Sequence, residues 1–285
     1  MTTVADFLRE SIDALTAAGV PTPDVDAELL IGNVLGLSRG EIQAKAIVGT
    51  ELSDDDRAAA TAAVERRAAR EPLQHITGVA AFRSLELGIG PGAFVPRPET
   101  EQVAQFAIDA LAAVPRDQPI GVDLGTGSGA IALAMASEVP HSLVYAIEKS
   151  PDAFAWATRN RERVGASNAT IVLGDLADAF VDLDGLVDVV ISNPPYIPAG
   201  AIPRDPEVRL HDPELALYGG ADGLDVVRQV STTAARLLHS GGTLVLEHGE
   251  LQGAEIAALL RDDGWSAVAT HRDLLGRDRA TTALK

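Results

Sequence analysis

Residues 122–130 read Val-Asp-Leu-Gly-Thr-Gly-Ser-Gly-Ala and join a short apolar strand, 120–124, to a helix over 130–138. Glycines let the backbone turn sharply and approach a ligand with no Cβ in the way. In open α/β sheets, ligands bind in the crevice at the carboxyl ends of the strands. The stretch therefore predicts a ligand-binding turn in an α/β domain, and a strand–helix turn without a ligand is the weaker interpretation.

Strand-like and helix-like segments alternate after this turn. Further strands are expected over 143–147, 170–173, 187–192 and 242–247, and helices over 151–164, 224–238 and 251–260. Residues 266–270 and 280–284 are expected to form a terminal strand pair. Continuous apolar strands that alternate with amphipathic helices indicate a mostly parallel sheet covered on both faces.

The N-terminal part of the chain has a different pattern. Helices are expected over 4–15, 26–37 and 53–70. Ser53 precedes three aspartates, which is typical of an N-cap at the positive end of a helix dipole. We expect residues 1–72 to form a helical substrate-docking domain. The glycine- and proline-rich residues 73–100 predict a connector with a β-hairpin, and residues 101–285 form the α/β domain.

Composition excludes several classes of protein. The chain has 285 residues, no cysteine and a net charge of −18. The lack of cysteine excludes disulfides, zinc–thiolate sites and cysteine nucleophiles, and we expect no metal site. The acidic charge disfavours binding to a phosphate backbone. The start of the chain lacks the pattern of a signal peptide, and no run approaches the about 20 apolar residues of a membrane span. We expect a cytoplasmic protein that binds neither membranes nor nucleic acid.

Two cofactor classes fit the glycine-rich turn. Gly125, Gly127 and Ala130 satisfy the dinucleotide pattern G-x-G-x-x-G/A, which leaves NAD open. Asp123 favours S-adenosylmethionine, because a carboxylate there would attract the ammonium of this cofactor and repel a pyrophosphate. Glu148 ends the next strand, where its two oxygens can accept hydrogen bonds from both hydroxyls of a ribose.

Asp175 follows the third strand of this series, at the same expected edge of the sheet. Its carboxylate is placed to accept a hydrogen bond from the amine of an adenine, with Leu176 beside the ring. A solvated loop aspartate is a strong alternative, because Asp178, Asp182 and Asp184 crowd the same region.

The most informative segment is Ser192-Asn193-Pro194-Pro195-Tyr196, which ends the strand over 187–192. The prolines fix φ and hold the asparagine in an extended conformation. Since neither proline has an N–H, the Asn193 side chain and the Pro194 carbonyl remain as acceptors. They suit a planar substrate with an NH2 group, and Tyr196 would form an aromatic wall. We expect Asn193, Pro194 and Tyr196 to be catalytic and Pro195 to be part of the substrate-binding surface.

Asn-Pro-Pro-Tyr together with Asp-Leu-Gly-Thr-Gly-Ser-Gly resembles the signature of S-adenosylmethionine-dependent amino-group methyltransferases. Further segments make the chain similar to the PrmC/HemK family, the N5-glutamine methyltransferases of peptide chain release factors. These segments are 72–78, 95–101, 123–136, 193–197, 211–217, 247–249 and 272–279.

The resemblance implies a class I methyltransferase fold, a Rossmann-like sheet of seven mostly parallel strands behind a small helical bundle. It also implies methylation of the glutamine in the Gly-Gly-Gln motif of class I release factors, with S-adenosylhomocysteine as the second product. Asn193–Tyr196 would grip the glutamine amide. The residues expected to line the cofactor are Asp123, Gly125, Thr126, Gly127, Ser128, Gly129, Glu148, Asp175, Leu176 and Asn193.

Three other functions remain open at this point. A DNA or RNA methyltransferase could use the same grip on an exocyclic amine, but the charge of −18 favours a protein partner. An NAD-dependent oxidoreductase leaves the Asn-Pro-Pro-Tyr segment unexplained, and a non-catalytic binding protein leaves the whole site unexplained. We assign no catalytic role to His75, His211 or His248, and we expect a monomer.

Overall fold

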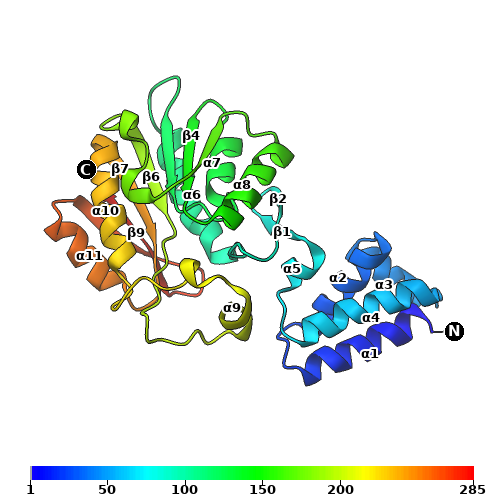
Figure 1. Ribbon diagram of the computed structural model, residues 1–285. Coiled ribbons are helices and arrows are strands. Elements are labelled where there is room, and N and C mark those ends of the chain that lie inside the picture. Colours follow the sequence, from blue (N-terminus) through cyan, green and yellow to red (C-terminus); the bar gives the residue numbers. More distant parts are fainter. Residues whose placement is uncertain (1) are drawn as a thin grey trace. The chain divides into compact units, whose positions relative to one another are not determined.

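The computed structural model describes residues 2–285, which form two compact units (Figure 1). The helical unit consists of the chain up to Val79 together with Pro203–His211, and the sheet unit consists of Ala80–Ile202 and Asp212–Lys285. The sequence predicts a helical domain over residues 1–72 and a connector over 73–100. In the structure, the helical unit also contains the segment 203–211. This segment follows the Asn-Pro-Pro-Tyr motif closely in the chain.

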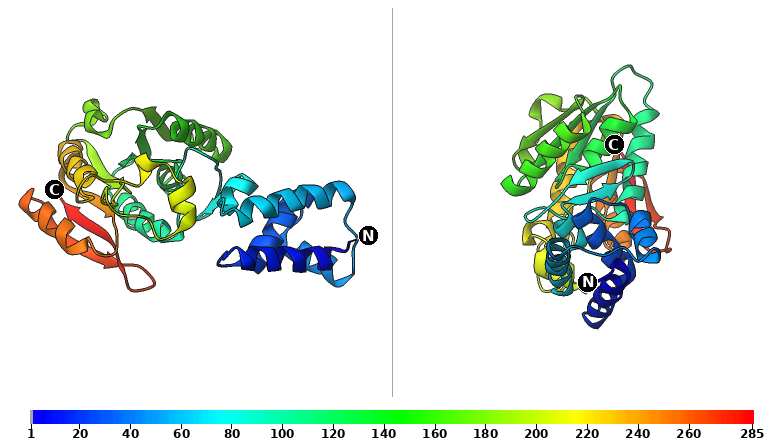
Figure 2. Two further views of the ribbon diagram at one scale, coloured as in Figure 1. Left: turned by 60° about the horizontal axis from the view of Figure 1, so that its bottom comes forward. Right: turned by 90° about the vertical axis from the view of Figure 1, so that its right-hand side faces the viewer.

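The helices of the N-terminal part lie side by side in Figure 2, and their buried apolar side chains form two small clusters. The helices of the helical unit are α1 (Val4–Ala17), α2 (Pro23–Leu35), α3 (Arg39–Ile47), α4 (Asp54–Ala68), α5 (Leu73–Thr77) and α9 (Pro206–His211). The Ser53 side chain accepts a hydrogen bond from the Asp56 backbone, as its sequence context predicts. Helix α3 was not predicted; it begins with a capping box between Ser38 and Glu41.

The sheet unit alternates strands and helices. Its main elements are β1 (Val79–Phe82), β2 (Leu85–Gly88), α6 (Pro98–Ala112), β3 (Ile120–Leu124), α7 (Ala130–Glu138), β4 (Leu143–Glu148), α8 (Pro151–Val164), β5 (Ala169–Leu173), β6 (Val187–Ser192), α10 (Asp225–Leu237), β7 (Leu238–Glu247), α11 (Gly253–Asp262), β8 (Ser266–Arg272) and β9 (Asp278–Leu284). Strands β1 and β2 form the predicted hairpin, and β8 and β9 form the predicted terminal pair.

Seven strands form the main sheet in the order β5-β4-β3-β6-β7-β9-β8. The first five in this order are parallel, and β9 is antiparallel to both of its neighbours. The predicted Rossmann-like, mostly parallel sheet is therefore confirmed. Because parallel strands end at the same edge, the residues that follow β3, β4, β5 and β6 share one edge of the sheet.

Both faces of the sheet are covered by helices. In Figure 1, helices α6, α7 and α8 lie on one side of the strands, and α10 and α11 lie on the other. All six residues of β6 are buried, and all but Asp188 and Ser192 are apolar, as expected for a strand covered on both faces. None of the helices in the described part of the chain has the length and apolar character of a membrane span.

Candidate active site

The glycine-rich turn presents backbone, not side chains, to open space. Gly125 and Gly127 have φ values of 79° and 59°, which favour glycine, and a Cβ atom on either residue would meet nothing within 4 Å. Thr126, Ser128 and Gly129 are buried. A ligand that reaches this turn would therefore contact mainly the backbone of the two glycines, which suits a group that needs close approach.

Asp123 orders the turn from inside the protein. Its Oδ2 accepts hydrogen bonds from the Thr126 hydroxyl (2.6 Å) and the Ala132 backbone N–H (3.1 Å). The residue is fully buried, and burial raises the pKa of its carboxyl to about 7. Its Oδ1 has no hydrogen-bond partner within residues 2–285. This placement supports an ordering role, and direct contact with a cofactor ammonium stays a prediction.

Glu148 lies beside the turn with its carboxylate already oriented. The Gly127 N–H donates to Oε2 (2.8 Å), and the Ser150 N–H donates to Oε1 (2.7 Å). Each carboxylate oxygen can accept a further hydrogen bond. The group is thus fixed next to the open space at Gly127, where it can accept from two neighbouring hydroxyls.

Asp175 follows β5 at the same edge, but its carboxylate is engaged by neighbours. Oδ2 pairs with the Lys149 ammonium (2.9 Å), and Oδ1 accepts from the Ala177 N–H and from Gln229 Nε2 (3.0 and 3.3 Å). The hydrogen bond from Lys149 is the main reason that the pKa of Asp175 lies below its usual value. Leu176 is half-buried and packs against an apolar cluster. These contacts favour a structural loop aspartate, and contact of either residue with an adenine stays a prediction.

The Asn-Pro-Pro-Tyr segment begins where β6 ends, next to the glycine-rich turn. The Ser192 hydroxyl donates to the Leu124 carbonyl (2.6 Å), and Asp123 pairs with Ile191 in the sheet register. The ends of β3 and β6 are therefore tied together. Pro194 is buried, whereas its three neighbours in the motif are half-buried.

Two glycines that were not identified from the sequence, Gly219 and Gly223, pack closely against the backbone of the Asn-Pro-Pro-Tyr segment. A Cβ atom on Gly219 would lie 2.4 Å from the Pro195 carbonyl oxygen, and one on Gly223 would lie 2.4 Å from that of Tyr196. Gln252 Nε2 also donates to the Tyr196 carbonyl (3.0 Å). Only glycine permits this close approach of two backbones. The run Gly-Gly-Ala-Asp-Gly over 219–223 is the signal that could have revealed it.

Two polar residues near the Asn193 side chain, Thr100 and Glu247, had no site role from the sequence, although both lie in segments that carry the family resemblance. Asn193 Nδ2 donates a long hydrogen bond (3.5 Å) to the Thr100 hydroxyl. Burial raises the pKa of the Glu247 carboxyl to about 7, whereas the neighbouring Thr100 and Asn193 side chains act to lower it. Burial, followed by the nearby Glu247 carboxylate, also raises the pKa of Tyr196. The site therefore combines an amide, a hydroxyl and a carboxyl behind the Asn-Pro-Pro-Tyr segment.

The three histidines considered from the sequence are divided between the two units. His248 is fully buried; its Nε2 lies 2.9 Å from the Thr281 hydroxyl, and burial lowers its pKa. His75 and His211 belong to the helical unit. Within residues 2–285, no group of three or more His, Asp or Glu side chains is arranged to hold a metal ion.

Comparisons with known proteins agree with this geometry. The family described as the PrmC N-terminal domain matches residues 6–78, and the methyltransferase small domain matches residues 97–204. A methyltransferase structure from Pyrococcus furiosus has a TM-score of 0.52 and 22% identity, covers 72% of this chain and 90% of that one, and supports the fold alone.

Two curated relatives match almost the whole chain. A 4-amino-L-phenylalanine/4-methylamino-L-phenylalanine methyltransferase of Streptomyces pristinaespiralis is 42% identical, over 93% of this chain and 89% of that protein. A release factor glutamine methyltransferase of Streptomyces coelicolor is 50% identical, over 98% of this chain and 96% of that protein. The chain therefore belongs to the family of release factor glutamine methyltransferases, which are S-adenosylmethionine-dependent enzymes that methylate protein glutamine.

Proposed function

We propose that this chain transfers a methyl group from S-adenosylmethionine to the side-chain amide nitrogen of the glutamine in the Gly-Gly-Gln motif of class I release factors. One observation carries the proposal. The acceptor-rich segment Asn193–Tyr196 and the open glycine-rich turn start from adjacent strand ends, tied by the bond from Ser192 to Leu124. A substrate amide held by the segment would therefore lie next to a cofactor held by the turn.

The residues at the turn fit S-adenosylmethionine. Gly125 and Gly127 border open space, and Glu148 is held by two backbone N–H groups with acceptor capacity left for the ribose hydroxyls. When bound, S-adenosylmethionine supplies an electrophilic methyl group on its sulfonium centre, with S-adenosylhomocysteine as product. Asp123, Thr126, Ser128 and Gly129 would support the turn from within.

The Asn-Pro-Pro-Tyr segment would make the amide nitrogen a better nucleophile. The lone pair of a primary amide nitrogen is delocalised into its carbonyl. Hydrogen bonds from its two N–H groups to Asn193 Oδ1 and the Pro194 carbonyl would increase electron density on nitrogen and fix its direction of approach. Tyr196 would form a wall of the slot, and Pro195 would keep it rigid. The methylated nitrogen is acidic and can release its proton to water.

A small aromatic amine is the second candidate substrate, because a relative of similar length is named for 4-amino-L-phenylalanine. The release factor enzyme of Streptomyces coelicolor is more similar to this chain, with 50% identity over 98% of it against 42% over 93%, and this difference favours the protein substrate.

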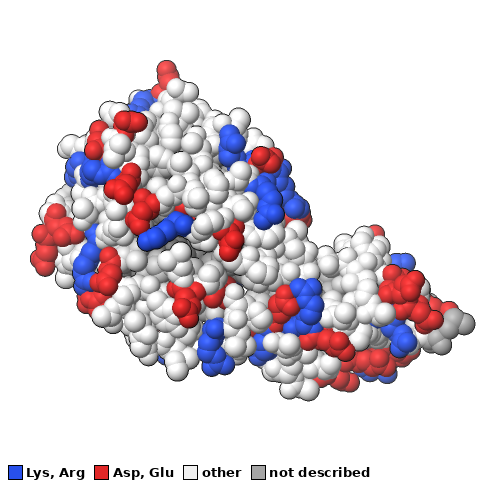
Figure 3. Space-filling view, in the orientation of Figure 1, with Lys and Arg blue, Asp and Glu red and all other residues white. Residues whose placement is uncertain are grey.

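The charge distribution supports a protein substrate over a nucleic acid. The net charge is −18, and on the face in Figure 3 the Lys and Arg side chains are scattered among Asp and Glu. A nucleic-acid enzyme would need cationic surface along the phosphates. A cytoplasmic location and a monomeric state stay predictions.

The proposal is tested by mass spectrometry of a purified class I release factor after incubation with the chain and methyl-labelled S-adenosylmethionine. We expect one added methyl group on the glutamine of the Gly-Gly-Gln motif, and none on a factor in which this glutamine is replaced. DNA, ribosomal RNA and free 4-amino-L-phenylalanine serve as competing substrates. Preferred labelling of any of these, or of another residue of the factor, would refute the proposal.

A further inference from the structure

A buried carboxyl group stands behind the amide that is proposed to grip the substrate. Glu247 is only 3% exposed, and its Oε2 has no hydrogen-bond partner among the described residues. Burying a carboxyl without full compensation is costly. The cost suggests that Glu247 has a task at this position which a well-packed apolar side chain could not perform.

The sheet register brings Glu247 next to Asn193. Strands β6 and β7 are parallel neighbours with Ser192 opposite Leu246, so Asn193 and Glu247 are the next residues at the same edge. Thr100 lies in the first turn of α6 and is 4% exposed. Its hydroxyl accepts from Asn193 Nδ2 (3.5 Å), and both side chains favour the ionised form of the neighbouring Glu247 carboxyl.

The chemistry of these groups determines which end of the Asn193 carboxamide faces outward. An asparagine has an acceptor oxygen and a donor NH2 group of nearly the same shape, and either can take the same place. A carboxylate accepts hydrogen bonds and donates none. It therefore attracts Nδ2 and leaves Oδ1 for the substrate. A protonated carboxyl can donate and loses this selectivity.

We propose that Glu247 and Thr100 are positioning residues, which hold the Asn193 carboxamide with Nδ2 inward and Oδ1 toward the substrate amide. This inference rests on the proposed function of Asn193 as an acceptor. In the reverse orientation, Nδ2 would meet the N–H groups of the substrate, so that donors would face donors. The fraction of correctly oriented enzyme then depends on the charge of Glu247.

The ionisation of Glu247 falls in the physiological range. Burial raises its pKa to about 7, Arg279 on β9 favours the carboxylate, and Glu99 on α6 opposes it. The Glu247 carboxylate in turn raises the pKa of Tyr196. We therefore expect kcat to rise with pH through neutrality as the carboxylate forms.

The experiment compares Glu247→Gln with Glu250→Gln, the same chemical change at an exposed position. We expect Glu247→Gln to lower kcat about 10- to 100-fold, the scale of a misplaced reactive group, with little change in the Kd of S-adenosylmethionine. Asp123 also has a pKa of about 7, so the pH profile is read as a difference between variants. The rise of kcat between pH 6 and 8 should be weaker in Glu247→Gln than in wild type and unchanged in Glu250→Gln.

A second pair of variants tests the same idea without touching the carboxyl. Thr100→Val removes the hydroxyl at constant shape, whereas Thr100→Ser keeps it. We expect a kcat several-fold lower for Thr100→Val and near wild type for Thr100→Ser. If circular dichroism shows that Glu247→Gln is unfolded, the two Thr100 variants test the positioning role instead.

Wild-type kcat together with a wild-type pH profile in Glu247→Gln would overturn the proposal, as would equal kcat in the two Thr100 variants. Asn193→Ala separates this failure from that of the proposed function. If Asn193→Ala is inactive while all positioning variants behave as wild type, only the positioning role is wrong. If wild type does not methylate the factor, the proposed function itself fails.

Discussion

Two buried glutamates, Glu207 in the helical unit and Glu247 in the sheet unit, have pKa values shifted in opposite directions. Glu207 in the helical unit is 7% exposed and pairs with Arg67 (2.7 Å) and Arg70 (2.6 Å). Burial alone would raise its pKa, but the hydrogen bonds from Arg70 and Arg67 hold the pKa well below its usual range. Glu247 in the sheet unit is 3% exposed, and burial raises its pKa to about 7. The charge of Glu207 is compensated by two arginines, whereas the charge of Glu247 changes with pH near neutrality.

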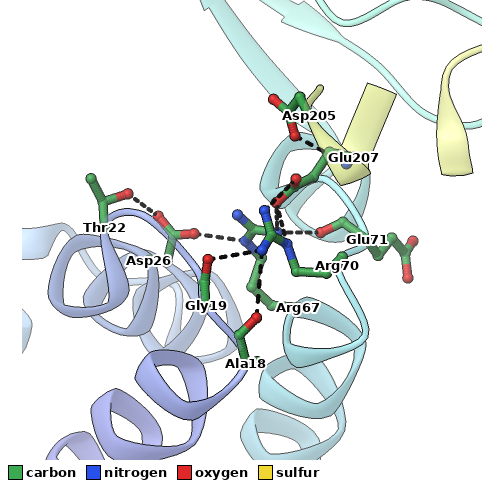
Figure 4. Close-up of polar contacts among 9 residues, drawn as sticks. All are labelled: Ala18, Gly19, Thr22, Asp26, Arg67, Arg70, Glu71, Asp205 and Glu207. Atoms are coloured by element: carbon green, nitrogen blue, oxygen red, sulfur yellow. Dashed lines mark hydrogen bonds and ion pairs between the residues drawn. The ribbon is translucent and has the colours of Figure 1, made fainter. Parts of the chain in front are cut away.

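The Glu207 cluster joins parts of the helical unit that are far apart in sequence (Figure 4). Arg67 also pairs with Asp26 of α2 (2.7 Å), and Arg70 donates to the Gly19 carbonyl (2.8 Å). The segment 203–211 is thereby fixed to the N-terminal helices. The comparison teaches that a buried carboxylate paired with two arginines stabilises the helical unit, whereas a buried carboxyl beside neutral polar groups belongs to the proposed site.

The largest expected effect is the loss of turnover in Asn193→Ala. Removal of the amide acceptor should reduce methylation of the release factor by about 100- to 1,000-fold, the range seen when a single oxyanion-hole donor is removed. The Kd of S-adenosylmethionine and the unfolding midpoint should stay near wild type. Turnover is measured with labelled cofactor and binding by calorimetry. Near-normal methylation would contradict the role given to the sheet unit.

The next largest effect is a loss of stability in Glu207→Gln. Glu207→Gln takes from Arg70 its carboxylate partner, although Arg67 keeps Asp26, and breaking a buried ion pair typically costs about 3–5 kcal/mol. Urea unfolding of Glu207→Gln should show this loss, and Glu10→Gln, an exposed change in α1, should not. The kcat for a short Gly-Gly-Gln peptide should change little. An unaltered unfolding curve would mean that the cluster does not stabilise the helical unit.

A smaller effect separates the two carboxylates expected at the cofactor. Glu148→Gln replaces an oriented acceptor of two hydroxyls and should raise the Kd of S-adenosylmethionine about 10-fold or more, as expected for a lost charge-assisted hydrogen bond. Asp175→Asn should raise it much less, because Lys149, Ala177 and Gln229 already engage this carboxylate. Calorimetric titration of both variants measures the difference. A larger rise of Kd in Asp175→Asn than in Glu148→Gln would mean that Asp175 makes the stronger contact with the cofactor.

The last expected effect is a pH dependence of stability with opposite signs for the two glutamates. The raised pKa of Glu247 means that the folded state keeps its proton between about pH 4.5 and 7, where the unfolded state has lost it. Stability from this group therefore falls as the pH rises through this window. Glu247→Gln should be more stable than wild type at pH 8 by about 1–3 kcal/mol, and similar to it at pH 5.

The depressed pKa of Glu207 has the opposite consequence. Its contribution is present above about pH 4.5, the usual range of a glutamate, and is lost as the pH falls toward its folded pKa. The deficit of Glu207→Gln should thus persist from pH 5 to 8. Urea unfolding of both variants at pH 5 and pH 8 measures the contrast. If the free energy of unfolding changes with pH in the same way in both variants, the two glutamates do not differ as proposed.

The parts of the fold that were predicted from sequence are those with local signals. The bounds of β3, α7, α8 and β6 follow from short, mostly apolar strands and from glycine or proline near the ends of these elements. Helix α3 was missed because Ile42 is its only buried residue, so it has almost no apolar periodicity. Helix α9 is held by Arg67, which lies 140 residues away in sequence.

The candidate site shows the same limit. The Asn-Pro-Pro-Tyr segment and the glycine-rich turn are contiguous motifs whose chemistry can be read from residue types. Thr100 and Glu247 come near Asn193 only through the packing of α6 and the register of β6 and β7. The sequence around Thr100 and Glu247 does not indicate that they lie near Asn193. The one local signal is a glutamate at the end of a buried strand, which is unusual.

The most direct measurement is a crystal structure of the enzyme with S-adenosylhomocysteine and a Gly-Gly-Gln peptide, at a resolution and pH that fix the orientation of Asn193. The account predicts that Asn193 Oδ1 and the Pro194 carbonyl lie within hydrogen-bonding distance of the glutamine nitrogen, with Nδ2 turned toward Thr100 and Glu247. A glutamine amide bound elsewhere, or an Asn193 with Nδ2 toward the substrate, would contradict it.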